Sequence, residues 1–139
     1  GVVKVGANSK VELKEKKDRV EDAIYATKAA LQEGIVAGGG VALLNAAKSI
    51  TAKNLNEEVL LNAIIAPFEK ILQNAGIEGY DLNLRKGMGY DVKTGKIINM
   101  VKAGIIDPVL VTKTALKNAV SVASTIISTD CIISNVRQN

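Results

Sequence analysis

Apolar residues recur at helical spacing through most of the chain, and this pattern predicts a mainly helical fold. The first such segment runs from about Ser9 to Glu33. Ser9 and Glu12 have the spacing of a capping box, and Gly34 can supply the left-handed residue that ends a helix. A helix of this length spans roughly 36 Å, which suits a bridge between two bodies. Its apolar face comprises Leu13, Val20, Ala23, Ile24, Thr27, Ala30 and Leu31.

Three further helices are predicted downstream. One follows the glycines at 38–40 and presents Leu43, Ala46, Ala47 and Ile50 on one face. The next starts near Asn56 and ends before Gly76, and Pro67 in its middle is expected to kink it. The last opens at Asp107-Pro108, with Asp107 as the N-cap and the proline in the first turn. Because this helix is apolar on most sides, we expect it to be buried in the centre.

Extended structure is expected in three places. The opening "GVVKVG" favours a strand, and "GYDVKTGKIINM" at 89–100 reads as a hairpin that turns around Lys93-Thr94-Gly95. Residues 130–136 form a candidate terminal strand. The polar, glycine-containing segment 78–89 is expected to be a loop or a short helix.

Composition narrows the possible chemistry. The 139 residues are 47% hydrophobic but only 3% aromatic, so one compact unit with an aliphatic core is expected. The 18 basic and 14 acidic residues are interleaved, which argues against nucleic-acid binding, and no apolar run is long enough to predict a membrane span. With no histidine and a single cysteine, Cys131, the chain offers no His-based catalysis, no internal disulfide and no expected metal site. Chemistry must rest on carboxylates, lysines or backbone amides.

A few residues could carry such chemistry. Asp22 lies opposite the apolar face of its predicted helix, where it could pair with Arg19 or be presented to a ligand. Gly38 and Gly39 precede a helix, so they could contact an anion or simply form a tight turn, and the Lys-Ser/Thr pair of a phosphate loop does not follow them. Asp107 could cap the last helix or belong to a binding site. Asp91 could stabilise the hairpin turn or belong to a binding site. From the residues alone, the structural interpretation is favoured for each.

The order of the whole set, however, resembles one family. The stretches "KEKKDRVEDAIYATKAALQEGIVAGGGVAL", "APFEKILQNAGIEG" and "GYDVKTGKIINMVKAGIIDPVLVTKTALKNAVSVAS" closely resemble the group I chaperonins, the GroEL family. The resemblance covers nearly the entire chain but only the C-terminal part of a subunit. It implies that residues 1–33 are the C-terminal segment of the intermediate domain. Residues 34–139 are then the C-terminal half of the helical equatorial domain.

The resemblance also implies roles for the candidate residues. Asp22 matches the acid that activates the attacking water in ATP hydrolysis. Gly38 and Gly39 match glycines that pack against the nucleotide, and Asp107 matches the acid that binds the ribose hydroxyls. Beside the adenine, the resemblance places the turn residues Asp91, Val92 and Lys93. The implied cofactor of the intact subunit is ATP with Mg²⁺.

The implied function is that of an ATP-dependent folding chaperone built as a ring of subunits. Its partners would be other subunits, unfolded client proteins and a co-chaperonin, in the bacterial cytoplasm or an organelle matrix. The phosphate loop and the magnesium-binding aspartate of the family lie outside the matched part. The isolated chain is therefore expected neither to bind nor to hydrolyse ATP efficiently, and to self-associate through exposed faces. The alternative is a stand-alone truncated paralog that acts as an interaction or structural module.

Overall fold

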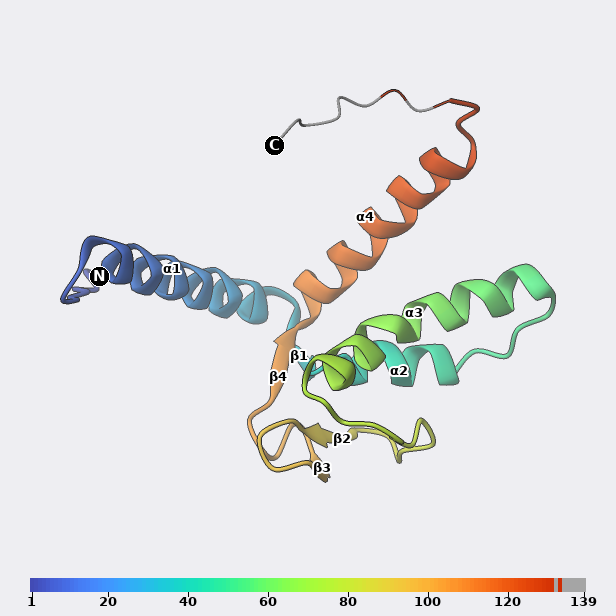
Figure 1. The fold of residues 1–139 in the computed structure, drawn as a ribbon, viewed down its shortest axis with the longest axis horizontal. Coiled ribbons are helices and arrows are strands. Elements are labelled where there is room, and N and C mark those ends of the chain that lie inside the picture. Colours follow the sequence, from blue (N-terminus) through green and yellow to red (C-terminus); the bar gives the residue numbers. More distant parts are fainter. Residues whose placement is uncertain (132, 134–139) are drawn as a thin grey trace.

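The computed structural model describes residues 1–131 and 133, and this part of the chain is mainly helical, as predicted. The helices are α1 (Lys10–Glu33), α2 (Val41–Lys48), α3 (Leu55–Asn74) and α4 (Val109–Ile127). The strands are β1 (Ile35–Ala37), β2 (Met88–Asp91), β3 (Lys96–Asn99) and β4 (Ile106–Pro108). Figure 1 shows α1 and α4 projecting in different directions from a junction at β1 and β4, with α2 and α3 on the side away from α1 and the small β2–β3 hairpin below.

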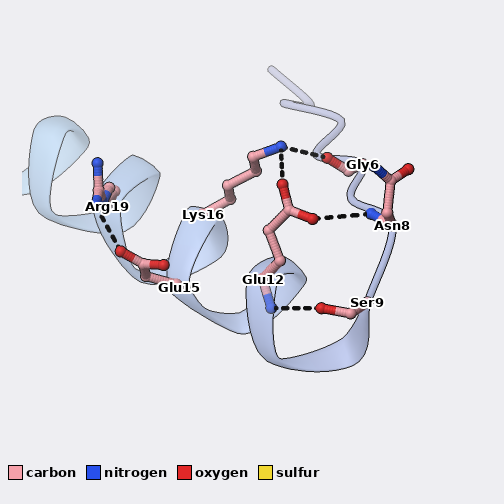
Figure 2. A network of polar contacts seen from close by, with 7 residues as sticks. All are labelled: Gly6, Asn8, Ser9, Glu12, Glu15, Lys16 and Arg19. Atoms are coloured by element: carbon pink, nitrogen blue, oxygen red, sulfur yellow. Dashed lines mark hydrogen bonds and ion pairs between the residues drawn. The ribbon is translucent and has the colours of Figure 1, made fainter.

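Local capping explains where α1 and α3 begin. The Ser9 hydroxyl accepts a hydrogen bond from the Glu12 N–H at 3.2 Å, and the Glu12 carboxylate accepts one from the Asn8 N–H at 3.1 Å (Figure 2). This is the predicted capping box, with the glutamate reaching one residue before the cap. Helix α3 is capped in the same way, since Asn54 accepts from the Glu57 N–H at 3.0 Å. It continues unbroken through Pro67.

The hydrophobic core lies between α2, α3 and the hairpin. Phe68 is its largest fully buried side chain, and the rings of Tyr80 and Tyr90 pack against it at centroid distances of 6.3 and 6.4 Å. Aromatic pairs of this kind add stability beyond the area they bury. The segment after α3, at 75–87, is irregular and folds over this core. The buried members of the core are Ala37, Val41, Leu44, Phe68, Leu72 and Met100.

Two antiparallel strand pairs complete the fold. The pairing of β2 with β3 confirms the predicted hairpin. The pairing of β1 with β4 was not predicted, because each strand has three residues and their partners lie about seventy positions away in the sequence. In this pair Val36 lies opposite Asp107 and Ala37 opposite Ile106. The pair therefore holds β1, which follows α1, beside β4, which precedes α4.

Several expectations about burial are wrong. Residues 1–6 form no strand, and Val2 is 88% exposed because no described segment pairs with it. Helix α4 has no buried residue, although its composition predicted a central position. On α1 the buried residue is Ala29, which lies on the row opposite the predicted apolar face, while Leu31 is 83% exposed. Periodicity shows which side of a helix is apolar, but not whether the chain itself supplies a partner.

Two smaller expectations also need correction. Ile50 lies beyond the end of α2 and is exposed, and the tight turn at the glycines before α2 follows a short strand. The predicted terminal strand at 130–136 lies largely outside the described residues.

Candidate functional site

The candidate site is built where β1 and β4 join the helices that follow them. The Gly38 N–H donates to the Ile105 carbonyl oxygen at 2.9 Å, and the Val109 N–H donates to the Gly34 carbonyl oxygen at 3.1 Å. These bonds extend the strand pair at both ends. They hold the start of α4 beside the end of α1, and the turn before α2 beside the residue that precedes β4.

The glycines at 38–40 allow this close packing. A Cβ atom on Gly38 would lie 3.1 Å from the Ile106 nitrogen, and one on Gly40 would lie 2.7 Å from the Phe68 Cα. Gly39 and Gly40 also have φ angles of 64° and 76°, in the left-handed region that favours glycine. The glycines therefore serve a packing role inside the chain. Of the three glycines, Gly40 lines the groove described below, whereas the predicted site residues Gly38 and Gly39 do not.

A groove of about 570 Å³ opens beside this turn. Gly40, Ala42 and Leu43 line it at the α2 end, together with Asp107 and Pro108 of β4. The remaining lining residues are apolar or small side chains of α3 and α4, with Thr112 as their one hydroxyl. Gly40 was not among the predicted site residues. The third glycine of the triplet was the signal in the sequence that could have identified it.

Asp107 is the one ionisable residue that lines the groove. Its predicted role as the N-cap of α4 is wrong: it lies inside β4, the cap position is Pro108, and no side chain caps this helix. Among the described residues, none makes a hydrogen bond or ion pair with the Asp107 carboxylate. Partial burial desolvates this carboxylate and raises its pKa. Its oxygen atoms are free to accept hydrogen bonds from a ligand hydroxyl.

The predicted adenine-side residues lie at the hairpin turn rather than in the groove. The Asp91 carboxylate accepts hydrogen bonds from the Lys93 N–H at 3.0 Å and the Thr94 hydroxyl at 2.8 Å, which lower its pKa. Asp91 therefore stabilises the turn itself. Val92 is 46% exposed and Lys93 is exposed as well. In this structure the turn residues do not line the same groove as Asp107.

Asp22 is exposed on α1, eleven residues before the end of the helix, or roughly 16 Å along its axis. Arg19 pairs with Glu15 at 2.5 Å (Figure 2). No described residue pairs with Asp22. On the same row of α1, Ala29 is buried and Ala26 is half-buried, and α1 contacts β4 and α4. Asp22 thus projects from the helix face that turns toward the junction, but it does not line the groove.

A long-range ion pair fixes the base of α1. The ammonium group of Lys113 on α4 lies 2.7 and 2.5 Å from the two carboxylate oxygens of Glu33 on α1. No sequence pattern indicated this contact, because the two residues lie 80 positions apart. It is an additional element of the site, since it ties the helix that carries Asp22 to the helix that lines the groove.

Two classes of site are absent from the described part of the chain. Residues 1–131 and 133 contain no group of three or more carboxylates or thiols that could hold a metal ion. No helix in the same residues is long and apolar enough to cross a membrane.

Comparison with known proteins places this arrangement in a family. A group III chaperonin crystallised in the open state matches 93% of the chain with a TM-score of 0.75 and 24% sequence identity, a likeness that shows the fold. The chain spans 30% of the length of that chaperonin. In sequence, residues 2–137 match the TCP-1/cpn60 chaperonin family. Because that match extends over nearly all of its residues, the chain belongs to the TCP-1/cpn60 chaperonin family.

Proposed function

We propose that this chain is the C-terminal part of a group I chaperonin subunit, an ATP-driven protein-folding chaperone that works as a ring. The observation that carries the proposal is the β1–β4 pair, which precedes the glycine turn on one strand and contains Asp107 on the other, so that Gly40 and Asp107 line a single groove. This arrangement suits the nucleoside end of ATP: the carboxylate can accept hydrogen bonds from ribose hydroxyls, and the apolar groove shelters the sugar.

The structure also supports a division of the chain at Gly34. Gly34 ends α1 with a φ of 83°, and α1 packs mainly on β4 and α4, at its C-terminal end. We assign residues 1–33 to the intermediate domain and 34–139 to the equatorial domain. Asp22 then lies on a helix, α1, that can move relative to the groove. We propose Asp22 as the general base that orients the attacking water once α1 has moved onto the bound nucleotide.

The proposed role for Mg²⁺ requires residues outside the described ones. Since residues 1–131 and 133 hold no cluster of metal ligands, Mg²⁺ and the phosphates of ATP would be held by other parts of the subunit. Bound Mg²⁺ would neutralise phosphate charge during hydrolysis. Gly38, Gly39 and Asp107 are proposed to face the nucleotide beside the strand pair. Asp91, Val92 and Lys93 are proposed to approach the adenine from the hairpin turn, outside the groove that Asp107 lines.

The test uses the protein as cells make it. An antibody against residues 89–100 would isolate the native product, whose intact mass, ATP hydrolysis and ability to refold a denatured client are then measured. We expect a mass several times 14.6 kDa and ATP-dependent refolding. In that product, D22N should abolish hydrolysis while ATP still binds, and the matched change D18N on the same helix should leave hydrolysis intact.

A second candidate is a stand-alone chaperonin paralog that acts as an interaction module. The specific observation in its favour is a core completed within the chain, with Val41, Leu44, Phe68, Leu72 and Met100 each at most 1% exposed. A native product of 14.6 kDa that neither binds ATP nor refolds a client would favour this candidate and contradict the first.

A further inference from the structure

One buried side chain, that of Met100, contacts both segments that are proposed to face the nucleotide. Met100 follows β3 directly and is 1% exposed. A Cβ atom on Gly39 would lie 2.9 Å from the Met100 Cε, and one on Gly89 would lie 2.9 Å from the Met100 Cγ and Sδ. Because neither glycine carries a side chain, Met100 packs directly against the backbone of both. It fills the space between the glycine turn (38–40) and β2, the strand that leads into the hairpin turn.

The backbone of Met100 joins the same two segments. Its N–H donates at 3.1 Å to the carbonyl oxygen of Gly87, immediately before β2. Its carbonyl oxygen accepts from the Ile105 N–H at 2.9 Å, and the Ile105 carbonyl oxygen accepts from the Gly38 N–H at 2.9 Å. This chain of hydrogen bonds runs from the hairpin to the glycine turn through backbone groups alone. A substitution at Met100 therefore keeps every group of the chain and changes only the side-chain packing.

A nucleotide at the proposed site would meet the two segments at different points. The glycine turn would contact it beside the strand pair, and Asp91, Val92 and Lys93 would contact the adenine from the hairpin turn. A ligand that contacts two segments of a protein binds tightly only when their separation matches its own dimensions. Binding groups must therefore be held within about 0.5 Å of their productive positions by well-packed neighbours. The side chain that lies between these two segments is that of Met100.

We propose that Met100 is a positioning residue, which sets the separation between the glycine turn and the hairpin turn and thereby the affinity for the nucleotide. This role rests on the nucleotide-binding function proposed for the two turns. Methionine suits the position because its unbranched side chain can fill an irregular gap between two backbones. Truncation of the side chain would leave a cavity that the surrounding atoms fill only in part. The two turns would then no longer be held at one separation.

The first test follows the two turns of the 139-residue chain without a nucleotide. M100A is compared with L72A, which truncates a core side chain of α3 with the same exposed fraction of 1%. Leu72 is not among the nearest neighbours of the two glycines that Met100 contacts. Amide hydrogen exchange is measured at Gly38 and at Gly95, whose N–H groups donate to Ile105 and, within the hairpin turn, to Asp91.

The two variants are compared at urea concentrations that give them the same free energy of unfolding, so that global unfolding contributes equally. We expect both amides to exchange about tenfold faster in M100A than in L72A, because only M100A loosens the two turns locally. Equal exchange in the two variants would overturn the proposal, since Met100 would then be an ordinary member of the core.

The second test measures ATP affinity by calorimetry in the native product that contains this chain. We expect M100A to weaken ATP binding about tenfold or more, because misplaced contacts cost affinity steeply, and L72A to leave it nearly unchanged. M100L, which conserves most of the side-chain volume, should restore the affinity. Equal weakening by M100A and L72A, or unchanged affinity in M100A, would overturn the proposal.

Together the two tests separate the role of Met100 from the proposed function. If the unmodified native product binds no ATP, the proposed function is wrong, and the exchange test still decides whether Met100 holds the two turns in place. If that product binds ATP and the two alanine variants behave alike in both tests, the role of Met100 alone is wrong.

Discussion

At the scale of single residues, Gly40 is required for two reasons: its backbone conformation favours glycine, and its neighbours leave no room for a side chain. It has a φ of 76°, and a Cβ atom there would lie 2.7 Å from the Phe68 backbone. Gly95 has a similar φ of 68°, but a Cβ atom there would meet nothing within 4 Å. G95A should therefore cost only the strain of the left-handed conformation, roughly 1–2 kcal/mol. G40A should cost clearly more, because a side chain also forces Phe68 out of the core.

The free energy of unfolding of both glycine variants can be measured by urea denaturation. Equal losses for G40A and G95A would show that the Phe68 contact contributes nothing.

The sequence indicated a special role for the glycines at 38–40, but it could not separate a ligand contact from packing. The atom that excludes a side chain at Gly40 belongs to α3, a segment 28 residues further along the chain.

Two aspartates should respond to pH with opposite signs. Burial raises the pKa of Asp107, so the folded state holds its proton more tightly than the unfolded state does. Its contribution to stability is therefore lost as pH rises from the ordinary carboxyl range through the raised pKa. Hydrogen bonds from Thr94 and Lys93 lower the pKa of Asp91, so its contribution is present at neutral pH and is lost as pH falls through the lowered value.

Accordingly, at neutral pH we expect D107N to stabilise the chain and D91N to destabilise it. At a pH below both folded pKa values the two effects should shrink toward zero. Urea midpoints measured from acidic to neutral pH check this. A stabilising D91N or a destabilising D107N at neutral pH would contradict the assigned environments.

At the scale of elements, the sequence predicted what local chemistry determines. Helix α1 begins at the predicted cap, Ser9, and ends at Gly34, and the hairpin forms around the predicted turn, which closes on Asp91. The strands β1 and β4 were missed because three residues carry no detectable period, and their pairing depends on segments brought together by the whole fold. For the same reason the Glu33–Lys113 pair, which fixes the base of α1, could not be anticipated.

This ion pair should hold α1 against α4 with modest energy. Both side chains are partly exposed, at 33% for Glu33 and 53% for Lys113, so solvent screens them and a contribution below about 1 kcal/mol is expected. E33Q should therefore barely change the unfolding free energy, yet it should speed amide hydrogen exchange in the last turn of α1. E15Q, which breaks the Arg19 pair within the helix, is the matched control and should leave that turn unchanged. Equal exchange in both variants would mean that the pair does not anchor α1.

At the scale of the whole molecule, the described residues form only part of the candidate nucleotide site. The groove offers one carboxylate, Asp107, and no cation lines it. Asp22 lies away from it on α1, and the turn at Asp91 does not reach it. The resemblance to a family indicated these residues one by one. Their separation in space could be seen only in the folded chain, since it depends on the direction in which α1 leaves the junction.

The isolated 139-residue chain should consequently bind the nucleoside part of ATP no worse than ATP itself. The phosphates of ATP would add negative charge beside Asp107, and the described residues supply no metal cluster to neutralise it. Calorimetric titrations with adenosine and with Mg²⁺-ATP should both show weak binding, without micromolar affinity for ATP. D22N should change neither titration, whereas D107N should weaken the binding of adenosine by removing an acceptor for the ribose hydroxyls. Micromolar binding of Mg²⁺-ATP would mean that the chain forms a phosphate site by itself. The proposal that other parts of the subunit hold Mg²⁺ and the phosphates would then be wrong.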